Sequence, residues 1–73
     1  MTIVINNNKI SKTTFELAYN LADKSGLNVV IFEADMGKEK KNFIATVPEF
    51  EGSPNKENLT KIATVNANGD FVD

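Results

Sequence analysis

No cysteine and no histidine occur among the 73 residues of this chain. Disulfide bonds and zinc sites are the usual supports of domains this small, so packing alone must stabilise the fold. A hydrophobic fraction of 41%, with five Phe, suffices for a packed core and argues against disorder. We expect a single domain over residues 1–73. Because small domains bury little of their surface, pairing with another copy would stabilise it further.

Arginine and tryptophan are also absent. The chain therefore has no imidazole to carry protons near pH 7, no thiolate nucleophile and no guanidinium group to grip a phosphate at two points. No nucleophile and base stand at a recognisable spacing, and no acidic residues follow the spacing of a calcium loop. We expect no enzymatic activity, no cofactor and no metal.

The net charge of −2 does not favour nucleic acid or anionic membranes as partners. No apolar run approaches the ~20 residues that a membrane span needs, and the segment after Met1 resembles a strand more than a signal peptide. We therefore expect a cytoplasmic protein. Ten Asn, with Lys as the basic residue throughout, are typical of AT-rich genes and indicate a low-GC bacterium, a phage or a mobile element.

The first half of the chain predicts a strand, a helix and a second strand. Residues 2–5 are all β-branched, and the turn-forming run 6–9 follows them. Thr13 and Glu16 have the spacing of a capping box at a helix start, and Gly26 provides its C-terminal end. The apolar side of this helix would comprise Phe15, Leu17, Ala18, Tyr19, Leu21 and Ala22.

Residues 28–34 form the expected second strand, apolar on both faces. Strand, helix and strand in succession predict a βαβ unit, whose two strands are parallel with a right-handed crossover. Lys38, Glu39, Lys40 and Lys41 would lie in a solvated connection. Residues 42–47 then form a third strand, antiparallel to the second and ended by Pro48.

Residues 54–66 allow two interpretations. A proline near the start favours a helix, whereas the many β-branched residues favour a strand over 60–66. Asn68-Gly69 is a strong hairpin signal, so we favour the strand, with a return at 71–72.

The predicted fold is α+β, with one amphipathic helix packed on a mixed sheet of four or five strands in the order β-α-β-β-β. Alternation along the central strand places Val29, Ile31 and Glu33 on one face, and Val30, Phe32 and Ala34 on the other. One helix covers one face, and the sequence does not decide which. The other face is either a binding surface or is covered by the chain's own residues 48–58.

These features favour a small protein–protein interaction module or homodimer that acts through an apolar sheet face or edge. The strand beginning at Thr2 or the one ending at Val72 would provide the edge, since terminal strands often lie there. The candidate interface residues are Val29, Ile31, Phe43 and Phe71.

An alternative function is the weak binding of an anion, a phosphorylated ligand or nucleic acid by the loop 6–14. Donors and positive charge gather there at a helix N-terminus, where free N–H groups favour anions. The candidate anion-binding residues are Lys9, Ser11, Lys12, Thr13 and Thr14.

Overall fold

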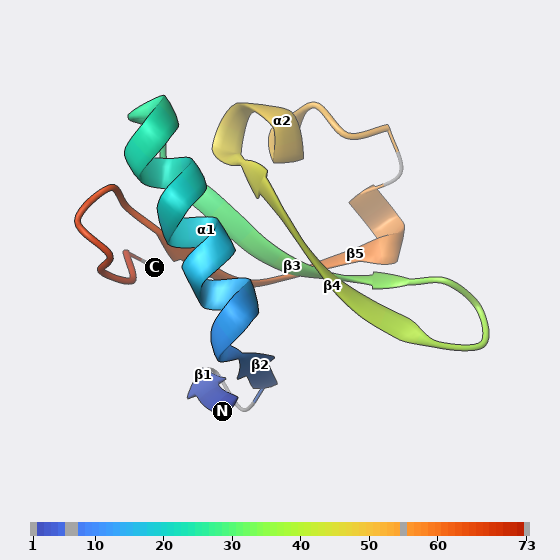
Figure 1. Ribbon diagram of the computed structural model, residues 1–73. Coiled ribbons are helices and arrows are strands. Elements are labelled where there is room, and N and C mark those ends of the chain that lie inside the picture. The colour runs from blue at the N-terminus through green and yellow to red at the C-terminus, as the bar shows by residue number, and fades with distance from the viewer. Residues whose placement is uncertain (1, 6–7, 55, 73) are drawn as a thin grey trace.

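Over residues 2–5, 8–54 and 56–72, which the computed structural model describes, the fold consists of two antiparallel sheets and one long helix (Figure 1). The elements in chain order are β1 (Thr2–Ile5), β2 (Asn8–Ser11), α1 (Lys12–Ser25), β3 (Val29–Asp35), β4 (Lys40–Thr46), α2 (Val47–Glu51), the 3₁₀ helix η1 (Lys56–Asn58) and β5 (Leu59–Val65). The α+β class predicted from the sequence is therefore confirmed.

The prediction of a parallel βαβ unit is wrong. β1 pairs with β2 in an antiparallel hairpin, from Thr2 opposite Ser11 to Ile5 opposite Asn8. Asn6 and Asn7, predicted as a turn, lie outside the described residues, whereas Asn8 and Lys9 belong to a strand. The sequence pattern of β2 is weak because its one apolar residue, the fully buried Ile10, shows no alternation.

The larger sheet has the strand order β4-β3-β5, with both pairings antiparallel. The predicted antiparallel pairing of the second and third strands is thus confirmed, but the sheet is neither mixed nor four-stranded within the described residues. β5 confirms the strand interpretation of residues 60–66, and Phe71 returns to form an isolated bridge with Val65. β4 begins at Lys40, so Lys40 and Lys41 are part of a strand and not of a connection.

Helix α1 starts two residues earlier than predicted. The cap is Ser11, whose Oγ accepts a hydrogen bond from the backbone N–H of Thr14 at 3.1 Å. Thr13 lies inside the helix, so the predicted Thr13 cap is wrong. Gly26 ends the helix as predicted: its φ of 71° is left-handed, and its N–H donates to the carbonyl oxygen of Ala22 at 2.9 Å.

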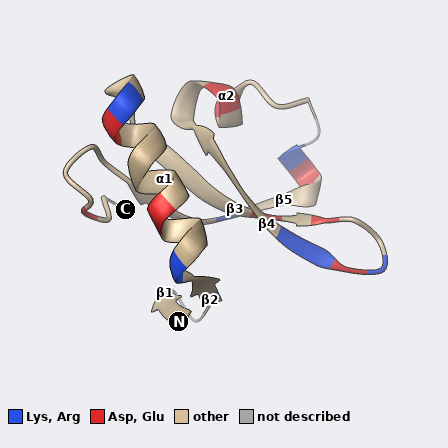
Figure 2. Cartoon of the chain, in the orientation of Figure 1, with Lys and Arg blue, Asp and Glu red and all other residues tan. Residues whose placement is uncertain are grey.

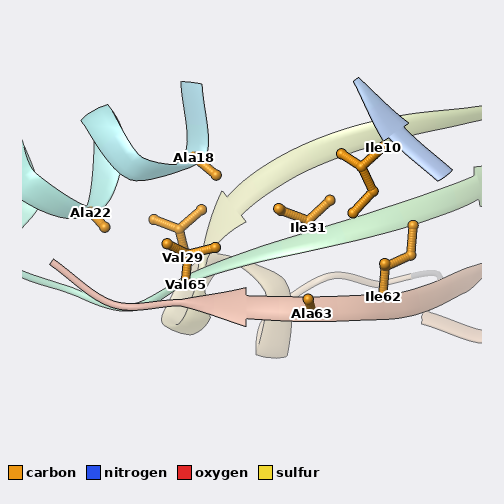
Figure 3. Packing of buried hydrophobic residues seen from close by; sticks show 8 residues of the cluster. All are labelled: Ile10, Ala18, Ala22, Val29, Ile31, Ile62, Ala63 and Val65. Carbon is orange, nitrogen blue, oxygen red and sulfur yellow. The ribbon is translucent and has the colours of Figure 1, made fainter. Parts of the chain in front are cut away.

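The face of the larger sheet that carries Val29 and Ile31, here called the α1 face, packs against α1 and against Ile10 of β2 (Figure 3). The pairing of β3 with β5 shifts register between Ile31 and Phe32, and Ile62 and Ala63, next to this shift on β5, both join the cluster. The buried residues of the cluster are Ile10, Ala18, Ala22, Val29, Ile31, Ile62, Ala63 and Val65.

The buried stripe of α1 is narrower than predicted. Ala18 and Ala22 are fully buried and Phe15 and Leu21 pack beside them, but Leu17 is 55% exposed. Tyr19 is also partly exposed. Residues four apart lie on one line of a helix, and small side chains on that line let the helix backbone approach the sheet closely.

The opposite face of the sheet, here called the α2 face, carries Val30 and Phe32. Both are buried, and the ring of Phe50 from α2 lies 5.1 Å from that of Phe32. Of the two interpretations of this face, the one in which the chain's own residues 48–58 cover it is therefore correct at the position of Phe50. Pro48, predicted to end a strand, instead stands in the first turn of α2, where its missing N–H costs nothing.

In the described part of the chain, no helix combines the length and apolarity needed to cross a membrane.

Candidate functional site

The structure separates the four residues expected at an interface. Val29 and Ile31 are 0% exposed because α1 and Ile10 cover them, so they offer no surface in this fold. Phe43 and Phe71 remain 41% and 42% exposed. They do not lie together, since Phe43 is on β4 while Phe71 bridges to β5 on the other side of β3.

Phe71 already has a partner within the chain. Its ring lies 5.5 Å from that of Phe15 on α1, and Val72 donates its N–H to the carbonyl oxygen of Thr64. The segment ending at Val72, which was expected to offer an edge to a partner, therefore pairs with the end of β5 in its own chain. Of the two aromatic residues, Phe43 is the one that stands beside an unpaired strand edge.

β4 is one of the two outer strands of the larger sheet, and no described strand pairs with its outer side. At the ends of its ladder with β3, Val47 N donates to Asn28 O and Met36 N donates to Glu39 O, each at 2.9 Å. In an antiparallel ladder, every second residue pair exchanges hydrogen bonds and the pairs between do not. The pair Phe32–Phe43 lies an even number of residues from both of these bonded ends. Phe32 and Phe43 therefore also exchange backbone hydrogen bonds.

Asn42 and Ile44 belong to the residue pairs that do not exchange hydrogen bonds with β3. Their backbone N–H and C=O groups therefore point away from β3. Lys40 and Thr46 share this orientation, but Thr46 is buried. The outward groups of Lys40, Asn42 and Ile44 therefore form a short free edge that can accept an extended chain.

Phe43 lies beside this edge on the α2 face. Its ring stacks on that of Phe32, with centroids 6.0 Å apart and planes at 28°, and Phe32 in turn contacts Phe50. The row of three rings begins in the core and ends at the surface of β4. A side chain held in this way offers apolar contact area with little conformational entropy left to lose.

Charges of both signs lie at the start of β4, and acidic residues follow its end (Figure 2). Lys38, Lys40 and Lys41 share the start with Glu39 and with Asp35, the residue of β3 opposite Lys40, whereas Glu49 and Glu51 follow in α2. Lys41 pairs with Glu39 at 3.5 Å, but both side chains are more than half exposed and such pairs stabilise little. Lysines also prevent indiscriminate pairing at an exposed edge, so a specific partner must accommodate them.

The carboxylate of Glu49 is held close to the end of β4. The hydroxyl of Thr46, the N-cap of α2, donates to Oε1 of Glu49 at 3.0 Å. Thr46-x-x-Glu49 is the same capping-box signal that we sought at Thr13 and Glu16, and it could have predicted α2. The two lysines at 40–41, typical of a protected edge strand, could likewise have indicated the free edge.

The residues expected to bind an anion are distributed around the start of α1. Lys9 lies in β2, and Lys12 and Thr13 are exposed in the first turn. The Oγ of Ser11 accepts from Thr14 N and lies 2.9 Å from Thr14 Oγ1. The Ser11 hydroxyl, the Thr14 hydroxyl and the Thr14 N–H thus bond to one another at the cap. Nothing in this arrangement selects an anion over water.

No pocket opens among residues 2–5, 8–54 and 56–72, and no three metal-binding side chains gather there. The free edge of β4 with Phe43 is therefore the candidate site. Comparisons of the chain with protein families, curated proteins and solved structures find no match.

Proposed function

We propose that the chain is a protein-binding module, and that it binds by adding an extended segment of its partner to the outer edge of β4. The observation that carries this proposal is the free backbone of Asn42 and Ile44 beside the half-exposed ring of Phe43. Backbone hydrogen bonds supply affinity in this mode of binding, and side-chain contacts supply specificity.

Asn42 offers a substitution that blocks the edge without touching the ladder to β3. Its N–H points outward, so proline at this position removes an outward donor and no bond within the sheet. Asn42→Thr keeps the donor and suits a strand, which makes it the matched control. Circular dichroism of both variants should show the fold of the parent chain.

The test is photo-crosslinking in cells with benzoylphenylalanine in place of Phe43. We expect protein adducts from position 43 that Asn42→Thr preserves and Asn42→Pro abolishes. The same probe at Leu17, 55% exposed on α1, controls for adducts that any exposed apolar side chain would form. Adducts that survive Asn42→Pro, or that form equally from position 17, would contradict the proposal.

A further inference from the structure

We propose further that the segment bound by β4 is β4 of a second copy of this chain, antiparallel to the first, with the two-fold axis at Phe43. This inference rests on the proposed function, because it identifies the partner of the same edge. The two larger sheets would join into one continuous sheet.

The direction of the backbone groups restricts the register. Hydrogen bonds between the copies must join outward-facing residues to outward-facing residues. An axis at Phe43 meets this condition, because it places Asn42 opposite Ile44 of the second copy in a pair that exchanges both backbone bonds. Phe43 then lies opposite Phe43 in a pair without hydrogen bonds, in which Cα atoms approach to about 4.5 Å.

In this arrangement Lys40 of one copy approaches the acidic start of α2 in the other, in addition to Asp35 opposite it on its own β3. Antiparallel pairing separates the two lysine-rich ends and brings each beside the α2 helix of the other copy. In this register Lys40 lies opposite Thr46, and residues directly opposite in a ladder share a face. Thr46 is the residue whose hydroxyl holds the Glu49 carboxylate, so Lys40 of each copy meets Glu49 of the other.

The two registers nearer the start of β4 lose these contacts. An axis at Lys41 would set two lysines directly opposite each other, which is destabilising. An axis at Asn42 would place Lys40 opposite Ile44, away from Glu49. The axis at Phe43 also covers the ring that is 41% exposed in the single chain, and it extends the row of Phe50, Phe32 and Phe43 across the interface.

Disulfide trapping tests the register, because the parent chain contains no cysteine. Cysteines in a pair without hydrogen bonds have a Cα separation that suits a disulfide. Purified Phe43→Cys should oxidise to a covalent dimer, and adding Asn42→Pro should prevent this. Met36→Cys, 58% exposed at the far end of the β3–β4 hairpin, should remain monomeric. Equal yields at positions 36 and 43, or a yield that Asn42→Pro leaves unchanged, overturn the inference.

Sedimentation equilibrium tests the charge contact without a cysteine. With rising concentration, the average mass of the parent protein should reach that of two chains. Lys40→Glu should weaken its self-association by roughly tenfold, which corresponds to the loss of two symmetry-related contacts. Glu49→Gln keeps a hydrogen-bonding side chain at the cap and should reduce the salt dependence of association. Lys12→Glu changes the net charge equally on α1 and should leave association unchanged.

The outcomes distinguish this inference from the proposed function. A chain that stays monomeric at every concentration, with no disulfide at position 43, overturns the self-pairing alone. The edge-binding proposal falls as well if photo-adducts from position 43 survive Asn42→Pro or form equally from position 17. An effect of Lys12→Glu equal to that of Lys40→Glu also overturns the self-pairing, because it shows that net charge, and not a specific contact, controls association.

Discussion

The hydroxyl of Thr46, the last residue of β4, donates a hydrogen bond to Oε1 of Glu49 at 3.0 Å and accepts one from the Glu49 backbone N–H at 3.4 Å. This pair turns the chain from the edge strand into α2. It also fixes a carboxylate next to the edge that we propose as the binding site.

Removing the cap should destabilise the fold. Thr46→Ala should lower the free energy of unfolding by about 1 kcal/mol, as for other N-caps. Thr46→Ser keeps the hydroxyl and should lose less. Urea denaturation measures both values, and equal losses in the two variants would show that the hydroxyl plays no part.

Phe50 should be the main anchor of α2. It is 9% exposed and covers Phe32, so Phe50→Ala should cost about 3 kcal/mol through lost burial and a residual cavity. Phe71→Ala is the matched control, because that ring is 42% exposed and its contact with Phe15 should contribute about 1 kcal/mol. Similar losses from the two substitutions would contradict the packing described for the α2 face.

Ile10 should attach the β1–β2 hairpin to the larger sheet. A two-stranded hairpin is marginally stable by itself, and Ile10 is the side chain of β2 that is fully buried. Ile10→Ala should cost about 3 kcal/mol and Ile10→Val about 1 kcal/mol. Val4→Ala, at a 65% exposed site on the same hairpin, should change stability by less than about 0.5 kcal/mol. A comparable loss at position 4 would count against this attachment.

Close contact between α1 and the sheet should make Ala18 intolerant of larger side chains. Ala18→Leu should cost about 2 kcal/mol by overpacking the α1 face. Leu17→Ala, one position along the same helix, should stay within about 0.5 kcal/mol because Leu17 is 55% exposed. Thermal unfolding of the two variants gives the comparison, and a stable Ala18→Leu chain would disprove the close approach.

The sequence predicts the elements with strong local signals. Gly26 marks the end of α1, and the apolar run at 29–32 marks the central strand. The alternation of Val29 and Ile31 with Val30 and Phe32 also separates the two sheet faces correctly. These signals succeed because turn chemistry and side-chain periodicity are local properties.

The parts that the sequence does not predict depend on tertiary contacts. β2 is a strand because Ile10 docks on the sheet, and nothing in its four residues shows this. The sequence places Val29 and Ile31 at an interface because one helix covers only one sheet face, but both lie on the face that α1 covers, where Ile10 of the hairpin adds to the cover. Asn42 and Ile44 were not singled out, since their role depends on which strand lies at the edge.

Hydrogen exchange at single amides of β4 tests the central claim most directly, since the claim concerns backbone groups. On binding, the amides of Asn42 and Ile44 should become protected, while those of Phe43 and Ala45, which face β3, should be slow to exchange in both states. If the bound chain exchanges at Asn42 and Ile44 as fast as the free chain, the outer edge of β4 is not the binding site.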